Sequence, residues 1–360
     1  MLLLHYICVT HHKGSLIPQG LKISALLLTV PLAFAQTEAP HVQIGNLLVK
    51  PSAFFESAGV FRSTTTTDDM NTRFGSLPTG EANPQALGTV RHSRVQLKTV
   101  YTVNKTWKLS AYLESDFMNR TGNPYRWRQY WGKVEMGKWE LLAGRGWSLL
   151  RPNRIGIDSE TELMNTRVID AAYHIGLVGN RERHLRLVRH EGTWHFALSY
   201  ERGRDFVPKV VRDLKRVHLE AMAIKGAGRH LGASTAAVVH VTPKVDIVTQ
   251  LYRARAAGRD VLNTLPQTAG TFSNINGVEI QPRPGLRIYA YTGLVNGAHS
   301  TGNHLVREDS VGFSHQFYNN AKYGRTLFSL QFSHLSRHTW SNADGRQTLG
   351  MVSIRHTIGE

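Results

Sequence analysis

The chain has 360 residues, a formal net charge of +17 and a mean hydropathy of −0.27. This composition excludes a bundle of membrane helices, because each such helix needs about 20 predominantly apolar residues in a row. The positive charge predicts an anionic partner such as a lipid headgroup or a small solute. The arginines are spread along the chain rather than clustered, so no nucleic-acid partner is expected.

Residues 1–35 have the features of a leader. The longest apolar run, Ile23–Ala35, follows Lys22 and ends in Ala33-Phe34-Ala35, which is typical of a secretory signal cleaved after Ala35. The alternative is a buried core helix. The single cysteine, Cys8, lies in this leader, so we expect a mature chain without disulfides. Loss of a leader with two lysines and no acids would change the net charge from +17 to +15.

Side chains alternate in character along Lys108–Phe117. Even positions are mainly polar, and odd positions are mainly apolar, as at Leu109, Ala111 and Leu113. A period of two predicts a β-strand with one wet face and one apolar face. After a predicted turn at Arg120–Pro124, the alternation resumes along Tyr125–Lys133. Here Arg126, Arg128 and Tyr130 are expected on one face and Trp127, Gln129 and Trp131 on the other.

The same period recurs from Val49 to Ile358 and predicts roughly sixteen strands of the length that tilted membrane strands need. Short turns alternate with longer connections, for which we expect Ser63–Leu87, Ser148–Thr166, Gly203–Arg212, Gly258–Asn276 and Ser336–Arg346. This alternation is typical of an outer-membrane barrel, which has short periplasmic turns and longer external loops.

The predicted fold class is therefore all-β: a closed antiparallel transmembrane β-barrel over residues 49–360, after a short periplasmic segment at residues 36–48. A soluble β-fold is the alternative. The barrel is favoured because its apolar face carries modest side chains while aromatic residues stand near the strand ends, as at Trp107, Tyr125, Trp139 and Trp194. We expect the protein in the outer membrane of a Gram-negative bacterium, in contact with outer-membrane lipid.

Four segments follow one another in the order found in a known family. They are RHSRVQLKT (Arg91–Thr99), YLESDF (Tyr112–Phe117), YRWRQYWGKVE (Tyr125–Glu135) and LAGRGWSLL (Leu142–Leu150). In these segments the chain resembles the DcaP-like porins of Gram-negative outer membranes. The resemblance implies sixteen strands, a homotrimer and the passage of small, often anionic, solutes. The chain departs from the family in three places: it has no room for the coiled coil that some members carry, it ends in Thr357-Ile-Gly-Glu360 rather than phenylalanine, and Arg145 replaces the usual glutamine.

Charged residues on the wet face are the candidate pore lining. They are Arg94, Lys98, Glu114, Asp116, Arg126, Arg128, Arg145 and Arg167. Opposite charges on neighbouring strands would form a ladder inside the pore, and rings of fixed charge select ions by sign. The alternative is that Glu114 and Asp116 only neutralise the arginines and stiffen the wall.

We expect a passive pore that favours small anionic solutes, without a cofactor and without enzymatic activity. The 18 histidines show no metal-binding spacing, and Ser314 cannot reach His315 because neighbours in a strand point to opposite faces. The alternative function is a barrel with a plugged lumen that acts as an enzyme or a structural protein. Ser148–Asn165 is long enough to be either a loop that constricts the pore or an ordinary external loop.

Overall fold

The computed structural model describes residues 41–65, 74–80, 82–118, 125–158, 169, 174–256, 260–261 and 270–359. All of them lie in the second of the two units into which the chain divides, Met1–Ala35 and Gln36–Glu360. None of the described residues forms a helix that is long and apolar enough to cross a membrane.

The described residues are almost entirely in β-strands. The first nine strands are β1 (Val42–Ile44), β2 (Leu47–Arg62), β3 (Gln85–Thr89), β4 (Arg94–Thr102), β5 (Trp107–Asp116), β6 (Arg126–Met136), β7 (Trp139–Trp147), β8 (Arg181–Glu191) and β9 (Trp194–Glu201). The others are β10 (Asp205–Asp213), β11 (Val217–Lys225), β12 (Leu231–Thr242), β13 (Val245–Arg255), β14 (Thr271–Arg283), β15 (Leu286–Gly297), β16 (Asn303–Asn320), β17 (Gly324–Thr339) and β18 (Asp344–Ile358). Two short 3-10 helices are η1 (Phe74–Ser76) and η3 (His299–Thr301).

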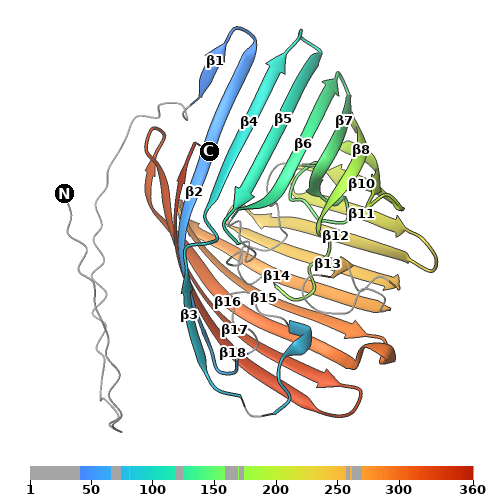
Figure 1. Cartoon of the computed structure of the whole chain (residues 1–360), viewed down its shortest axis with the longest axis vertical. Helices are drawn as coiled ribbons and strands as arrows, with labels where there is room; N and C mark the ends of the chain where they lie inside the picture. The colour runs from blue at the N-terminus through green and yellow to red at the C-terminus, as the bar shows by residue number, and fades with distance from the viewer. Residues whose placement is uncertain are drawn as a thin grey trace, which may run out of the picture. The chain divides into compact units, whose positions relative to one another are not determined.

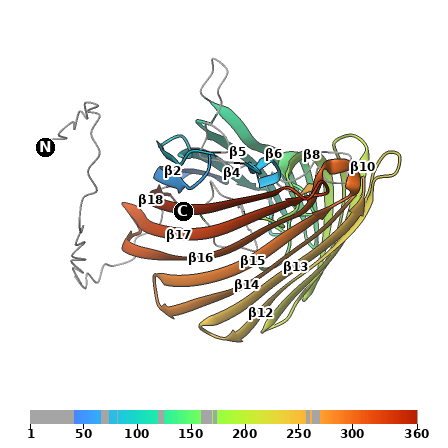
Figure 2. The same ribbon diagram turned by 90° about the horizontal axis from the view of Figure 1, so that it is seen from below.

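The strands form one closed antiparallel sheet. From β4 to β18 each strand pairs with the next, and β18 pairs with β2, so that Val352 lies opposite Gly59 (Figure 1). β3 and β4 pair with successive parts of β2 and share one position in the wall, while β1 extends the start of β2 as a short arm. The wall therefore has sixteen strand positions. In Figure 2 the wall made by β12–β18 lies in front of the one made by β2–β8. The predicted fold class is confirmed.

The period of two places apolar side chains on the outside. On β5, Leu109 and Leu113 are 41% and 42% exposed, whereas Ser110 and Glu114, which directly follow them, are buried. The same alternation recurs round the barrel, as with Leu219 outside and Glu220 inside on β11. An apolar outer face and a polar inner face are the reverse of a soluble protein, and they are what a barrel in lipid requires.

One end of the barrel has tight turns and the other has longer connections; we call them the turn end and the loop end. Tight turns at Gly137, Gly192 and Gly285 use positive φ angles of 61°, 61° and 77°, which glycine adopts without strain. The start of β2 and the end of β18 also lie at the turn end, paired as Ala53 with Ile358.

Two of the expected long connections are wrong. Gly203–Arg212 contains most of β10, because the chain turns back within Arg202–Arg204. Ser336–Arg346 is mostly strand, and only residues 340–343 connect β17 to β18. Pro208 interrupts the pattern of residues that is typical of a strand, so the sequence did not predict β10. The pairing of β10 with β11 passes from Phe206 directly to Lys209, which accommodates the missing N–H group of the proline.

Candidate functional site

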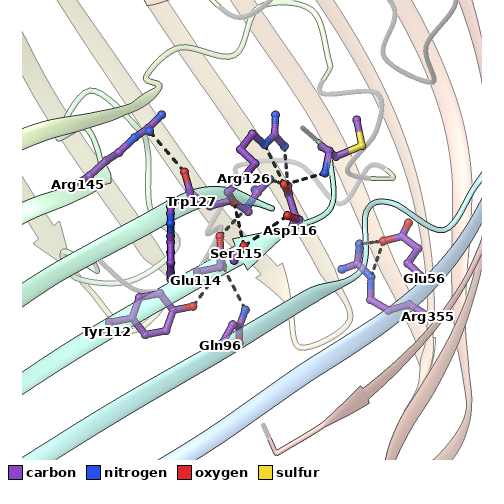
Figure 3. Close-up of polar contacts among 12 residues, drawn as sticks. Glu56, Gln96, Tyr112, Glu114, Ser115, Asp116, Arg126, Trp127, Arg145 and Arg355 are labelled. Atoms are coloured by element: carbon purple, nitrogen blue, oxygen red, sulfur yellow. Dashed lines mark hydrogen bonds and ion pairs between the residues drawn. The ribbon is translucent and has the colours of Figure 1, made fainter. Parts of the chain in front are cut away.

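Two carboxylates on β5 meet two arginines on β6 at the loop end of the inner face (Figure 3). Asp116 Oδ1 accepts a hydrogen bond from Arg126 Nε at 2.9 Å, and Asp116 Oδ2 accepts from Arg126 Nη2 at 2.6 Å and Arg128 Nη1 at 2.7 Å. Arg128 Nε donates to Glu114 Oε1 at 2.6 Å. The Arg128 side chain is 2% exposed, but that of Arg126 is 41% exposed. Arg128 therefore braces the wall, whereas the Arg126 side chain stays exposed on the inner face.

A β-bulge puts Gln129 and Trp131 on the same face as these two arginines. Glu114 pairs with Gln129 and Ser115 with Trp127, so Arg128 is the extra residue on β6. Trp127 is 55% exposed on the outside, while Gln129 and Trp131 are buried. The expectation that Trp127, Gln129 and Trp131 share a face is wrong, because the alternation changes phase at the bulge.

Further polar groups surround Glu114. Its Oε2 accepts hydrogen bonds from Gln96 Nε2 and from the Tyr112 hydroxyl, both at 3.2 Å. The Tyr112 ring stacks on Trp131 with 5.3 Å between ring centroids. The charges of Arg94 and Arg181 also act on Glu114. Four arginines thus act on the two carboxylates of β5, namely Arg94, Arg126, Arg128 and Arg181.

A similar pair continues this lining onto β2 and β18. Arg355 donates to Glu56 Oε2 from Nε at 3.0 Å and from Nη2 at 2.6 Å, and Ser353 Oγ donates to Glu56 Oε1 at 2.8 Å. The Arg355 guanidinium lies over the Phe54 ring, 4.2 Å from its centroid, and Arg94 lies 5.0 Å from the same centroid. We call these residues the charged ladder: Glu56, Arg94, Glu114, Asp116, Arg126, Arg128, Arg181 and Arg355. It contains five arginines and three acids.

The structure brings together most of the residues expected in the pore. Arg94, Glu114, Asp116, Arg126 and Arg128 belong to the charged ladder. Lys98 pairs with the inward-facing Tyr112 and so shares the inner face.

One expected pore residue is placed differently. Arg145 pairs with Tyr130, which pairs with Leu113, and paired residues share a face of the sheet. Because Leu113 is exposed outside, Arg145 lies in an outward-facing row, where its Nη1 is 3.5 Å from the carbonyl oxygen of Trp127. Arg167 lies outside the described residues.

The described parts of the connection between β7 and β8 fold against the inner wall. Leu149 and Leu150 are buried among residues of β8–β12 such as Val188 and Met222. The N–H groups of Leu149, Asn153 and Gly156 donate to Glu201, Glu220 and Asp213 at 3.0, 2.8 and 2.8 Å. We call residues 148–158 and 174–180 the inner connection. Of Ser148–Asn165, the part after Asp158 lies outside the described residues.

Lys209 on β10 fixes the first part of the inner connection. Its Nζ donates to Arg151 O at 2.9 Å and to Asn153 Oδ1 at 2.8 Å, and it lies 3.1 Å from Glu220 Oε2. Two hydrogen bonds and one ion pair thus engage this buried ammonium group. The neighbouring Arg154 pairs with Glu279 on β14, and Glu279 also accepts from Arg287 Nη1 at 2.9 Å.

The second part of the inner connection lies against β14–β16. Ile175 N donates to Glu308 Oε2 at 2.9 Å, and Ser273 Oγ donates to Gly176 O at 2.7 Å. The charged ladder occupies β2, β4–β6, β8 and β18, so β8 is the one strand that the two features share among those named here.

Sequence reasoning missed the residues that hold the inner connection: Lys209, Glu220, Glu279 and Glu308. Lys209, for example, is a single charge at an inward position between the apolar inward residues Val207 and Val211. A lone buried charge of this kind needs a partner. The sequence could therefore have shown that such a charge has a partner inside the barrel, but not which residue that partner is.

We expect Gly293→Ala to lower the free energy of unfolding by about 1–3 kcal/mol, the usual cost of overpacking. A Cβ atom at Gly293 would lie 2.0 Å from Ile175 O and would push the inner connection off β15. Urea unfolding of the barrel in lipid vesicles measures this cost. The control is Gly132→Ala, since a Cβ atom there meets nothing within 4 Å. Equal effects of the two substitutions would contradict the close contact.

No three His, Cys, Asp or Glu side chains come together to hold a metal ion within the part of the chain that the structure describes.

No protein-family model and no curated protein matches the sequence. Solved structures do match. The outer membrane channel DcaP of Acinetobacter baumannii is 13% identical with a TM-score of 0.69, and the alignment covers 90% of this chain and 100% of that one. OmpF of Salmonella typhi is 10% identical with a TM-score of 0.61, covering 89% and 100%. OmpT of Vibrio cholerae, an outer membrane protein in a trimer form, is 12% identical with a TM-score of 0.56, covering 86% and 99%.

At these identities the likeness concerns the fold. The closed sixteen-position barrel and the outward apolar face agree with it. The chain has the porin fold and resembles the DcaP channel in structure.

Proposed function

We propose that the protein is an outer-membrane porin through which small hydrophilic solutes diffuse, anions in preference to cations. The observation that carries this proposal is the charged ladder, in which five arginines accompany three acids and the inward Arg126 side chain is 41% exposed. An exposed guanidinium on an inner wall requires water there. Fixed positive charge in a water-filled passage raises the local concentration of anions.

The solute path in this proposal runs between the inner connection and the charged ladder. The acids Glu201, Glu220 and Glu279, which anchor the inner connection, are buried and engaged by its N–H groups, by Lys209 or by Arg154. The ladder arginines Arg126 and Arg355 retain exposed surface. Selectivity is expected to weaken with salt, because charges are screened over about 10 Å at 0.1 M.

The membrane orientation follows the barrel's own asymmetry. Tight turns face the periplasm in outer-membrane barrels, and longer connections face outward. Export through a signal cleaved after Ala35, removal of residues 1–35 and assembly as a homotrimer are parts of the same proposal. The trimer form described for Vibrio cholerae OmpT supports the last of these.

We expect Arg126→Gln to shift the reversal potential of single channels in a KCl gradient toward the cation side. The change removes one exposed positive charge from the lumen, while Asp116 keeps its bond from Arg128. The measurement is made in a planar bilayer on the wild type and the variant at 0.1 M and 1 M salt.

The matched control is Arg145→Gln, which removes the same charge from the outward-facing row on β7 and is expected to leave selectivity unchanged. A potassium-selective wild type, or identical shifts from both variants, would contradict anion selection by the charged ladder. Absence of any conductance would favour the plugged barrel instead.

A further inference from the structure

The outer surface of β9–β13 is positively charged at the loop end. From Trp194 to Ala256 every residue is described, and none of the acids in this range is classed as exposed. The exposed basic residues at the loop end of the range are Arg204, Lys225, Arg229, Arg253 and Arg255. These exposed basic residues therefore have no exposed acids in the same range with which to form ion pairs.

Lys225, Arg253 and Arg255 project from one small area of the outer face, the rim patch. Lys225 pairs with Leu231, and Leu231 pairs with Arg255, so the three stand in one row across β11–β13. Arg253 lies two residues along β13 on the same face. Strands are about 4.8 Å apart, so Lys225 and Arg255 start about 10 Å from each other. Neither Arg253 nor Arg255 makes a hydrogen bond or ion pair with any residue that the structure describes.

Aromatic residues place the rim patch at the level of lipid headgroups. Lys225 pairs with Phe206, which pairs with Tyr200, and the two rings lie 5.0 Å apart. Aromatic girdles mark the membrane interface in barrels of this kind. Lys225 and Arg255 share a row, and the tilt of the strands by about 35–45° separates their depths by only part of the roughly 10 Å between them. Arg253 starts one row closer to the midplane, and its long side chain can extend toward the interface.

Apolar surface lies directly beside these charges. Leu231 is 52% exposed between Lys225 and Arg255, and Phe272, which pairs with Arg253, is 39% exposed. The outward positions below Lys225 and Leu231 are the small Ala223 and Ala233, which pair with each other. Acyl chains can contact this surface while an attached phosphate contacts the cations.

We propose that the rim patch binds the phosphate group of an anionic lipid in the membrane leaflet at the loop end. Guanidinium groups suit this role because they donate two parallel hydrogen bonds to one phosphate. The ligand is a lipid rather than free phosphate, because the cations lie among exposed apolar side chains. This inference depends on the barrel lying in a membrane and not on its selectivity for solutes.

The test titrates the intact barrel in zwitterionic detergent with lipid A and counts bound lipid by native mass spectrometry. We expect Arg253→Gln/Arg255→Gln to weaken binding about 30-fold, since each cation near a membrane surface contributes about fivefold to the affinity. Arg253→Lys/Arg255→Lys keeps both charges and is expected to retain most of the affinity. Lys215→Gln/Arg216→Gln, at the turn end of β10 and β11, is the control and is expected to bind as the wild type does.

Three results would overturn the proposal. The first is unchanged lipid binding by Arg253→Gln/Arg255→Gln, shown by electrophoretic mobility to be folded. The second is displacement of lipid A by inorganic phosphate at equal concentration, which would indicate a site for free phosphate. The third is loss of oligomeric state with lipid binding intact, which would indicate that the rim patch contacts a second copy of the chain.

Discussion

Lys209→Met is expected to lower the free energy of unfolding by up to about 3–5 kcal/mol, the cost of breaking a buried ion pair by removing one partner, with His218 Nε2 still 2.9 Å from Glu220 Oε1. The Lys209 and Glu220 side chains are both 0% exposed. Methionine fills a similar volume but donates no hydrogen bond. Glu220 Oε2 loses its cation, and the acceptors on Arg151 and Asn153 lose their donor.

The same substitution should loosen the inner connection locally. The amides of Leu149, Asn153 and Gly156 are bonded to wall carboxylates, so they report directly on its attachment. Hydrogen–deuterium exchange of these amides is expected to be faster in Lys209→Met than in the wild type, while exchange in β16–β18 stays the same.

A double variant separates the charge pair from simple loss of packing. Lys209→Met/Glu220→Gln removes both charges and keeps an oxygen that can accept from Asn153 N. We expect it to be more stable than Lys209→Met alone, because no buried charge is left unpaired. If the double variant is as unstable as the sum of the two single variants, the pair is not what fixes the inner connection.

The wall of the barrel could be predicted from the sequence because its signal is local. Each strand needs an apolar outer face against lipid, and a period of two records that need residue by residue. Leu109 and Leu113 show it on β5. The prediction failed where one residue breaks the period: Arg128 at the bulge reversed the faces of Gln129 and Trp131, and Pro208 concealed β10.

The interior was predictable only in part, because its contacts join distant segments. Arg126, Arg128, Glu114 and Asp116 come from one hairpin, so their charges could be placed together from the sequence. Lys209 and Asn153 are 56 residues apart, and Arg154 and Glu279 are 125 apart. No periodicity links such pairs. The length of the β7–β8 connection left open whether it folds inward, and the buried Leu149 and Leu150 answer that question.

Arg128→Met is expected to cost up to about 3–5 kcal/mol of unfolding free energy, because it removes one partner of a buried ion pair. Glu114 would lose its hydrogen-bonded cation and keep the neutral donors Gln96 and Tyr112, while the charges of Arg94 and Arg181 still act on it. Asp116 would retain both hydrogen bonds from Arg126. The cost therefore arises mainly at Glu114, and Arg128→Met/Glu114→Gln is expected to recover part of it.

Arg126→Met provides a matched control, since it makes the same replacement two residues away and removes a partner of the same Asp116. Its side chain is 41% exposed, so solvent screens the pair and the expected cost is at most about 1 kcal/mol. Urea unfolding in lipid vesicles measures both variants. Arg126→Met should alter ion selectivity with little loss of stability, and Arg128→Met should do the reverse. Equal costs for the two variants would contradict the assignment of Arg128 as a buried brace and of Arg126 as an exposed lumen charge.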